Sequence, residues 1–455
     1  MMSSIAKLRM DAQHIFQAGV TAADPCAAVQ QHLHYDAQQQ LLSMHLTDGS
    51  CLQGKWLKVH LIAFGKAACA MISAAQAIIP EQHITGTSIA VTNYENVQTL
   101  ANIEVIGARH PLPDAAGLLG AQKIANKVQQ AQSGELVLVL VSGGGSALLP
   151  SPVSAISLTN KVTTTELLLA SGASINEVNC VRKHLSQLKG GGLAKLAAPA
   201  DVHTLILSDV LGDELSAIAS GPTVADSSTF AEAVAILHDR QLWDQVPLSV
   251  QAHLEQGTQA LHAETPKAND AIFKHTTQTV IGSNSISVQA IMQASATLNY
   301  VTYLYSKQLI GEARVVAEQL VIYAKNLLLQ GMDRPCAILA GGETTVTIKG
   351  SGLGGRNQEM ALAFILAAEK HQLNVAWVFL SGGTDGIDGP TNAAGGLVDN
   401  KSLQRMHDAA IEPAQYLANN DAYHALQISE DLLMTGATGT NVADLQILLI
   451  YPQLI

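Results

Sequence analysis

The sequence predicts an α/β protein in which a parallel sheet is covered by helices on both faces. Short, nearly continuous apolar runs alternate with helical patterns along most of the 455 residues, as where Val59–Phe64 is followed by the alanine-rich helical stretch Lys66–Ile79. Strands that are buried on both faces of a parallel sheet have this pattern. Three glycine-rich loops also follow apolar runs, and ligands in such sheets bind beyond the carboxyl ends of the strands.

The first half of the chain supplies most of the predicted parallel sheet. Two helices are expected within residues 3–35, and Asp24-Pro25 marks the start of the second one. Strands are expected at Leu41–Leu46, Val59–Phe64, Ser88–Val91, Glu104–Ile106, Leu136–Val141 and His203–Leu207. Further helices are expected at 66–79, 114–131, 157–171 and 229–241.

The second half repeats this α/β pattern after a weaker stretch. Residues 243–277 are interrupted by Pro247, Gly257 and Pro266, so we place the domain junction there, between a domain of residues 1–245 and one of residues 275–455. Strands are expected at 278–281, 336–340, 344–349, 375–380 and Leu445–Tyr451. Helices are expected at 283–297, 311–330 and 357–371.

Composition and charge exclude several classes of function. The net charge is −12 and no Lys/Arg tract is present, so no nucleic-acid partner is expected. No apolar stretch approaches the ~20 residues of a membrane span, and no membrane partner is expected. The five cysteines form no C-x-x-C pair, which predicts reduced thiols and a cytoplasmic protein. Only 14% of the residues are charged, which leaves room for a homo-oligomer with a buried subunit interface.

The first glycine-rich loop and a lysine stand at the ends of two predicted strands. The loop Ser142–Ser146 follows Leu136–Val141, and Gly65-Lys66 follows Val59–Phe64. Backbone N–H groups of a glycine loop can surround an anion, and a cation at the start of a helix can meet a phosphate. Gly65-Lys66 lacks the other residues of a Walker motif, so Lys66 is either a phosphate-binding cation or a solvated lysine.

The other two glycine-rich loops lie in the second half. Gly350, Gly352 and Gly355 spell G-x-G-x-x-G directly before Arg356. This spelling alone is a weak dinucleotide fingerprint, and Arg356 suits an oxyanion clamp, although a glycine-rich turn also accounts for the pattern. The third loop follows the expected strand 375–380 and contains Gly382, Gly383, Asp385 and Asp388.

Charged side chains near other strand ends are candidate ligands. Asp209 and Asp213 follow a predicted strand at i, i+4 spacing, so both carboxylates could face one Mg²⁺ ion. Capping of a helix N-terminus is the alternative for either residue. Arg182 lies in a basic helical stretch and either binds a carboxylate or lies on a solvated face.

Taken in order, these motifs resemble those of the class II glycerate kinases, which phosphorylate D-glycerate at the 2-hydroxyl and have often carried the name hydroxypyruvate reductase. The matching segments are Gly65–Ala68, His110–Asp114, Ser142–Leu149, Arg182–Ser186, Lys189–Gly191, Ser208–Val210, Ser220–Thr223, Gly341–Val346, Gly354–Glu359, Ser381–Gly386, Thr435-Gly436 and Gly439–Leu445. They run through nearly the whole chain. One departure is Phe64, where the family often has a smaller residue.

The resemblance implies a Rossmann-like three-layer N-terminal domain, a smaller α/β C-terminal domain and an active site in the cleft between them. It also implies D-glycerate as substrate, with ATP and Mg²⁺. Lys66 and Arg356 would stabilise charge on the transferred phosphoryl group, and Asp209 or Asp213 would hold Mg²⁺ or orient the hydroxyl. The candidates for the glycerate side are Ser142, Gly143, Gly144, Ser146 and Arg182. The candidates for the nucleotide phosphates are Gly352, Gly354, Gly355, Gly382, Gly383 and Asp385.

Two other functions stay open as alternatives. An NAD(P)H-dependent hydroxypyruvate reductase would use the G-x-G-x-x-G spelling, but the sequence offers no evident His–carboxylate pair for hydride transfer. A non-catalytic nucleotide sensor is the second alternative. The presence of Lys66, Arg356 and the paired aspartates argues against it.

Overall fold

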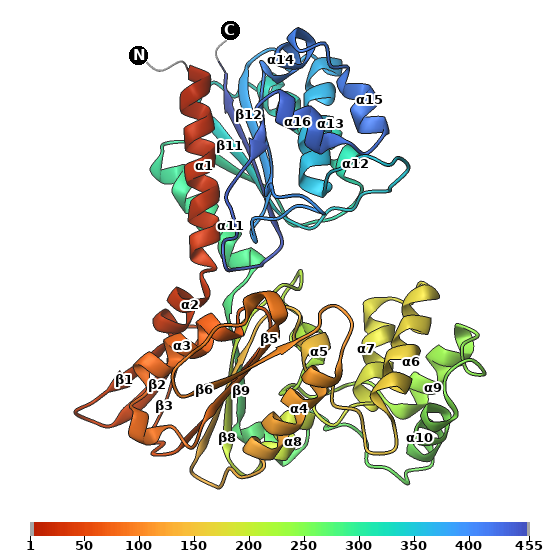
Figure 1. Ribbon diagram of the computed structural model, residues 1–455. Helices are drawn as coiled ribbons and strands as arrows, with labels where there is room; N and C mark the ends of the chain where they lie inside the picture. Colours follow the sequence, from red (N-terminus) through yellow and green to blue (C-terminus); the bar gives the residue numbers. More distant parts are fainter. Residues whose placement is uncertain (1–3, 453–455) are drawn as a thin grey trace. The chain divides into compact units, whose positions relative to one another are not determined.

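The chain forms two compact units in a computed structural model that describes residues 4–452 (Figure 1). One unit is Pro25–Ile281, and the other joins the N-terminal segment up to Asp24 to the residues from Gly282 onward. This division differs from the predicted domains 1–245 and 275–455 in two ways. The N-terminal helix packs in the second unit, and the stretch 243–277 remains within the first.

The unit Pro25–Ile281 is built on a six-stranded sheet with the strand order β6-β5-β4-β7-β8-β9. These strands are β4 (Val59–Phe64), β5 (Ser88–Asn93), β6 (Ile103–Ala108), β7 (Leu136–Val141), β8 (Asp201–Leu207) and β9 (Thr276–Gly282). The pairs from β6 through β8 are parallel. Numbered within the sheet, the order is 3-2-1-4-5-6, the dinucleotide-fold order whose direction reverses between β4 and β7. The predicted Rossmann-like sheet is therefore confirmed.

Every residue of β4, β5 and β7 is buried, which explains why β7 is apolar throughout and β4 is apolar except at His60. The helices of this unit are α2 (Pro25–His32), α3 (Ala68–Ile78), α4 (Ala115–Val128), α5 (Gly145–Leu148), α6 (Leu158–Ala170), α7 (Ile175–His184), α8 (Gly192–Ala197), α9 (Phe230–Asp239) and α10 (Leu248–Thr258). A small antiparallel sheet joins β1 (Leu33–Asp36), β2 (Leu41–His45) and β3 (Cys51–Gly54), of which the sequence predicted only the middle strand.

The second unit contains a six-stranded mixed sheet with the order β10-β11-β15-β12-β13-β14. Its strands are β10 (Val301–Leu309), β11 (Cys336–Gly342), β12 (Ala376–Gly383), β13 (Gly395–Asp399), β14 (Leu432–Leu433) and β15 (Asp444–Tyr451). Only β10 and β11 pair in parallel, because the C-terminal strand β15 inserts between β11 and β12 and runs antiparallel to both. The predicted α/β character of the second half is therefore confirmed, and its sheet is mixed.

Helices cover both faces of this mixed sheet (Figure 1). On one face α1 (Ser4–Ala22) and α11 (Asn284–Thr297) pack on Leu339, Val378 and Ile447. On the other face α12 (Ala313–Leu329) and α13 (Arg356–Lys370) pack on Ile338, Phe379 and Leu448. The short helices α14 (Ser402–Asp408), α15 (Pro413–Ala418) and α16 (Ala422–Ile428) complete the unit.

An ion-pair network anchors α1 to the second unit. Arg9 Nη1 lies 2.6 Å from Asp399 Oδ2 and 2.9 Å from Asp431 Oδ1, and Arg405 pairs with the same two carboxylates. Both aspartates are buried. The network joins residues 390 positions apart in the chain, so local sequence patterns do not reveal it.

The strand predicted at 344–349 does not form. Only Thr345 makes an isolated bridge, to Glu312, and Ile348 is exposed. The stretch alternates in sequence like a strand, but the edge of the sheet is occupied by β10, a strand that the sequence pattern did not predict. The second glycine-rich loop therefore follows irregular chain.

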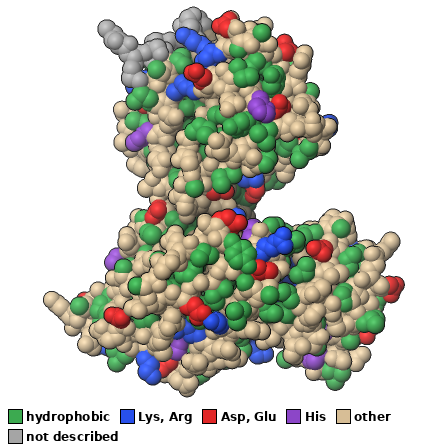
Figure 2. Space-filling model, in the orientation of Figure 1, with side chains coloured by type: hydrophobic (Ala, Val, Ile, Leu, Met, Phe, Trp, Pro, Cys, Tyr) green, Lys and Arg blue, Asp and Glu red, His purple; other side chains and the backbone are tan. Residues whose placement is uncertain are grey.

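Within residues 4–452, no helix is long and apolar enough to cross a membrane. The face drawn in Figure 2 carries acidic and basic side chains interspersed with uncharged ones.

Candidate active site

The turn after β4 and the loop after β7 pack backbone against backbone at the point where the strand order reverses. The Lys66 N–H donates to the Gly143 carbonyl at 2.9 Å, and the Ala67 N–H donates to Ser142 Oγ at 3.0 Å. Gly65 has a φ of +120°, and a Cβ there would lie 2.4 Å from the Ser142 carbonyl oxygen. Only glycine fits so close an approach. Lys66 and the first glycine-rich loop therefore form one structure.

Asp209 joins this structure from the end of the neighbouring strand β8. A Cβ on Gly143 would lie 2.4 Å from Asp209 Oδ2, so the carboxylate rests directly against the glycine loop. Burial raises the pKa of Asp209, while the charge of Lys66 and the Gly144 amide oppose that rise. Lys66, the loop glycines and Asp209 thus converge at the carboxyl ends of β4, β7 and β8.

The backbone between Asp209 and Asp213 is not helical. Residues 209–213 form a turn rather than a helix, and Asp213 has a φ of +54°. The i, i+4 spacing therefore does not place its carboxylate above that of Asp209, as helical geometry would. No hydrogen bond or ion pair within residues 4–452 joins the two aspartates. The same part of the chain contains no group of three or more His, Cys, Asp or Glu side chains arranged to hold a metal.

A cavity of about 310 Å³ opens beside the first glycine-rich loop. Its wall includes Gly144, Ser146, Lys161 and Arg182, together with apolar side chains such as Leu158. A cavity of this size accommodates a small organic molecule.

Two basic side chains of this wall, Lys161 and Arg182, and the adjacent Lys189 form no ion pair within residues 4–452, although Glu166 also lines the cavity. Lys161 Nζ donates to the Leu185 carbonyl at 3.1 Å, and Lys189 Nζ donates to the Ser146 carbonyl at 2.8 Å. No ion pair involves Lys161, Lys189 or Arg182 anywhere in the described chain 4–452. Burial lowers the pKa of Lys161 and Lys189 well below the ordinary value, and the nearby Arg182 charge adds to the effect. Because burial disfavours their charged forms, an anion bound here would stabilise the ammonium forms of both lysines.

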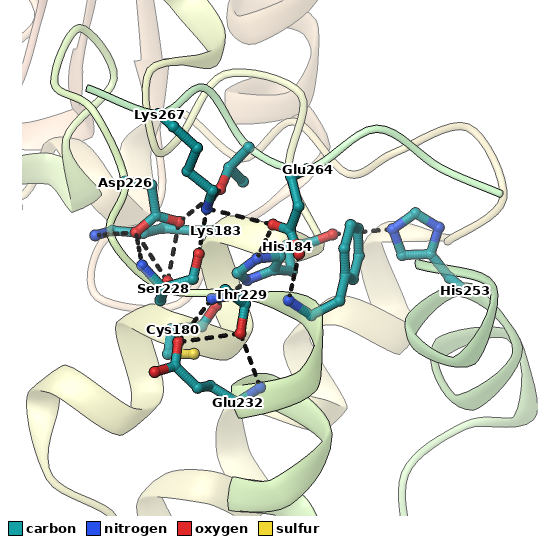
Figure 3. A network of polar contacts seen from close by, with 12 residues as sticks. Cys180, Lys183, His184, Asp226, Ser228, Thr229, Glu232, His253, Glu264 and Lys267 are labelled. Carbon is teal, nitrogen blue, oxygen red and sulfur yellow. Dashed lines mark hydrogen bonds and ion pairs between the residues drawn. The ribbon is translucent and has the colours of Figure 1, made fainter. Parts of the chain in front are cut away.

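The basic residues at the end of α7, Arg182 to His184, have two different roles. Lys183 Nζ lies 3.2 Å from Asp226 Oδ1, and His184 Nε2 lies 3.1 Å from Glu264 Oε2. Figure 3 shows these carboxylates converging on α7 within a network of polar contacts. Lys183 and His184 therefore hold neighbouring segments together, which leaves Arg182 as the member of the stretch that faces the cavity.

Arg356 begins α13 and is held by two acidic side chains of its own unit. Its Nε and Nη2 bond to the two carboxylate oxygens of Asp444 at 2.6 and 2.9 Å, and its Nη1 lies 2.7 Å from Glu343. Burial works against the charged form, but the hydrogen bonds and charge of Asp444 outweigh it and raise the pKa of Arg356. About a third of the side chain, 34%, is exposed. The guanidinium is therefore oriented by carboxylates in advance of any ligand.

The N-terminus of α13 is capped by an acidic side chain. The backbone N–H groups of Asn357 and Gln358 donate to the two oxygens of Asp388 at 3.1 and 2.8 Å. Burial raises the pKa of Asp388 to about 7, with Asp444 adding to the rise. Two of the N–H groups that could attract a phosphate at this helix end are thus already bonded to a carboxylate.

The glycines before α13 have packing roles. A Cβ on Gly352 would lie 2.3 Å from Asp421 Cβ, and one on Gly355 would lie 2.4 Å from Asp388. Gly354 has more room, since its nearest neighbours are 3.5 Å away. A dinucleotide fingerprint requires a strand directly before the loop, and irregular chain stands there instead. The G-x-G-x-x-G spelling therefore lacks its structural context.

Gly382 and Gly383 belong to β12 rather than to a loop. They pair with β13 and β15, and a Cβ on Gly382 would lie 2.9 Å from Phe16 of α1. The third loop begins at Thr384, and Asp385 accepts a hydrogen bond from the Ile387 N–H within it. Gly382 therefore lies in a strand that packs closely on α1 rather than in a loop, and its contact with a nucleotide phosphate stays a prediction.

Comparison with known proteins identifies the family. A model described as "Domain of unknown function (DUF4147)" matches residues 11–255, and one described as "MOFRL family" matches residues 336–444. A glycerate 2-kinase of Pyrococcus horikoshii is 39% identical over 439 residues, covering 95% of this chain and 94% of the relative. This chain belongs to the class II glycerate kinase family.

A solved structure of a family member supports the fold directly. The crystal structure of glycerate kinase from Thermotoga maritima superimposes with a TM-score of 0.85 at 35% identity, covering 98% of this chain and 100% of that one. Another relative, from Agrobacterium vitis, is 39% identical over 442 residues and carries a name that refers to hydroxypyruvate reductase. Both the predicted family and its mixed naming are confirmed.

Sequence reasoning missed Lys161 of α6 as a cavity residue. It lies three residues after Leu158 and seven before the buried Leu168, so it falls on the buried face of the helix. A lysine on the apolar face of an amphipathic helix was the sequence feature that could have indicated a buried basic residue at a site.

Proposed function

We propose that this protein transfers the γ-phosphoryl group of ATP to the 2-hydroxyl of D-glycerate, which gives 2-phosphoglycerate and ADP. One observation of the molecule carries the proposal: a small cavity lined by Lys161 and Arg182, neither of which forms an ion pair within residues 4–452, lies beside Lys66 and the glycine loop at the strand-order reversal. Glycerate is a small carboxylate, and ligands of this sheet type bind at that reversal. The kinase names of relatives that match nearly the whole chain support the same reaction.

In this proposal Arg182 and Lys161 receive the glycerate carboxylate. Both line the cavity, and neither has an acidic partner in the described chain. The loop residues Ser142, Gly143, Gly144 and Ser146 then lie on the side of the reacting hydroxyl. An arginine suits this role because its planar fork matches a carboxylate.

Lys66 and Asp209 serve the phosphoryl group. Phosphoryl transfer depends mainly on positioning and on charge stabilisation, which a lysine at a strand end can supply. Asp209 fits as a Mg²⁺ ligand, because its carboxylate rests against the glycine loop and Mg²⁺ needs only one or two carboxylates besides phosphate oxygens and water. When bound, the ion would neutralise phosphate charge. Asp213 is the weaker candidate, since its turn carries it away from the helical spacing.

Arg356 is the second cation that we propose for the phosphoryl group. About a third of the Arg356 side chain is exposed, and Asp444 fixes the orientation of its guanidinium. Both features suit a preorganised donor of hydrogen bonds to phosphate oxygens. For the nucleotide phosphates, the sequence proposed Gly352, Gly354, Gly355, Gly382, Gly383 and Asp385. Gly354 is the one of the three loop glycines with space around it.

Coupling to enolase tests both the reaction and its regiochemistry. The protein is mixed with ATP, Mg²⁺, D-glycerate and enolase without a phosphoglycerate mutase. Phosphoenolpyruvate is expected, because enolase accepts the 2-phospho isomer directly. The reductase alternative is tested with hydroxypyruvate and NADH or NADPH in the absence of ATP. Steady oxidation of NADH or NADPH in the second mixture, together with no ADP formation in the first, would contradict the kinase proposal and favour the reductase.

Glycerate binding is expected to take up protons. Burial lowers the pKa of Lys161 and Lys189 in the free protein, and a bound carboxylate favours their ammonium forms and so raises both pKa values. The affinity for D-glycerate should therefore be highest at a pH below the lysine pKa values of the free protein. It should fall as the pH rises from those values to the higher lysine pKa values of the complex. Calorimetry in buffers of different ionisation enthalpy counts the protons. A count of zero at every pH on both sides of neutrality would contradict this charge assignment.

A further inference from the structure

We propose that Ser146 determines specificity by accepting a hydrogen bond from the 2-hydroxyl of the substrate, and that a buried chain from Lys189 to Asn179 holds its hydroxyl in the accepting orientation. The site would then distinguish a 2-hydroxy acid from the 2-oxo acid of the same carbon skeleton. This inference rests on the proposed function, because it takes the cavity beside Arg182 as the glycerate site.

Four polar side chains from separate segments form this chain. Lys189 Nζ donates to Ser146 Oγ at 3.0 Å and to the Ser146 carbonyl at 2.8 Å. Ser146 Oγ lies 2.8 Å from Ser220 Oγ, and Ser220 Oγ donates to Asn179 Oδ1 at 3.0 Å. Lys189, Ser220 and Asn179 are buried, whereas Ser146 is partly exposed and lines the cavity.

The end of the chain dictates the direction of every hydrogen bond in it. The Asn179 carbonyl oxygen can only accept, so it takes the single proton of the Ser220 hydroxyl. Ser220 must then accept from Ser146, which commits the single proton of Ser146 as well. Lys189 donates to Ser146 in either charge state, because even a neutral amine has two N–H bonds for its two acceptors.

Ser146 Oγ therefore has one acceptor position left and no proton to offer. A hydroxyl oxygen accepts two hydrogen bonds, and Lys189 fills only one of them. The remaining acceptor belongs to the one member of the chain that reaches the cavity. A substrate alcohol can donate to it, which would also turn the lone pairs of the alcohol oxygen toward an incoming phosphoryl group.

The oxygen of a 2-oxo group in the same place can only accept a hydrogen bond, so it cannot pair with the acceptor position of Ser146 Oγ. Sites built to hydrogen-bond a substrate hydroxyl discriminate strongly against analogues that lack it, because a buried polar group is left unpaired. D-glycerate and hydroxypyruvate form the matched pair of ligands, since they share the carboxylate and the C3 hydroxyl and differ at C2.

Calorimetric binding of these two ligands without nucleotide tests the proposal. We expect the unmodified protein to bind D-glycerate at least about tenfold more tightly than hydroxypyruvate. Ser146→Ala removes the acceptor, so the two affinities should come within about threefold of each other. Ser220→Ala frees the Ser146 proton to point into the cavity, so the affinity ratio should shift at least about tenfold toward hydroxypyruvate.

Thr165→Ala is the matched control. Thr165 also lines the cavity, but its hydroxyl donates to the Lys161 carbonyl of its own helix at 2.9 Å. Its removal should leave the affinity ratio unchanged, which separates the predicted effect from any loss of a hydroxyl in the cavity. Thermal unfolding of each variant checks that the protein remains folded.

The outcomes separate this inference from the proposed function. Binding of D-glycerate with an affinity ratio that Ser146→Ala does not alter would overturn the role of Ser146 and leave the kinase proposal standing. An unmodified protein that binds neither ligand and makes no ADP would overturn both. If Ser220→Ala fails to fold, the Ser146→Ala ratio decides the matter by itself.

Discussion

Lys66→Ala is expected to lower kcat for glycerate phosphorylation by about 10²- to 10⁴-fold, the usual cost of removing a preorganised electrostatic contact. The side chain of Lys66 passes beside Gly144 and its charge acts on the buried Asp209, so it lies among the groups proposed to meet the phosphoryl group. The fold should be little affected. The contacts that hold the turn use the Lys66 N–H and carbonyl, which alanine retains.

Steady-state kinetics with varied ATP and D-glycerate measures this effect. We expect KM for D-glycerate to change much less than kcat, because the carboxylate is assigned to Arg182 and Lys161. Lys58→Ala is the matched control, since Lys58 precedes the opposite end of β4 and pairs there with Glu135. Turnover close to that of the unmodified protein in Lys66→Ala would make Lys66 a solvated lysine.

Arg356→Ala is expected to destabilise the second unit by about 3–5 kcal/mol, the typical cost of leaving a buried charge without its partner. Asp444 is fully buried, and both of its oxygens bond to the Arg356 guanidinium. Arg356→Lys retains the charge but loses the bidentate fork, so its loss of stability should be smaller. Denaturant unfolding followed at equilibrium gives the difference in free energy.

A double variant separates stability from catalysis at this position. Asp444→Asn combined with Arg356→Ala removes the unpaired charge and should recover part of the lost stability. If Arg356 stabilises the phosphoryl group as proposed, the double variant regains its fold and remains inactive. A double variant that regains turnover along with its stability would reduce Arg356 to a structural ion pair.

Local sequence was sufficient for the parallel sheet of the unit Pro25–Ile281. Strands such as β4 and β7 are buried on both faces, so their sequences are almost entirely apolar and are readily distinguished from the helices between them. The same pattern placed Lys66 and the loop Ser142–Ser146 after strand ends, where the structure brings them into contact. The ordered motifs were also sufficient to identify the family.

Pairings between distant residues escaped the sequence patterns. Nothing in the amphipathic pattern of α1 specifies which sheet it covers, and Arg9 meets Asp399 and Asp431 only in the folded chain. Likewise, Arg356 and Asp444 lie 88 positions apart. The helix end before Asn357 looked free for a phosphate in the sequence, because Asp388 reaches it only in the folded chain.

The sequence by itself determined the α/β class, the family and the positions of Lys66, Arg182 and the first glycine-rich loop. Only the tertiary structure decided which basic residues form an anion site. In the sequence, Lys161, Arg182 and Lys189 are ordinary helix and turn residues that could all be solvated. Folding brings Lys161 and Arg182 to the wall of one cavity and Lys189 next to it, and none of the three forms an ion pair with a carboxylate within residues 4–452. Burial lowers the pKa of both lysines, and a bound anion would favour their charged forms.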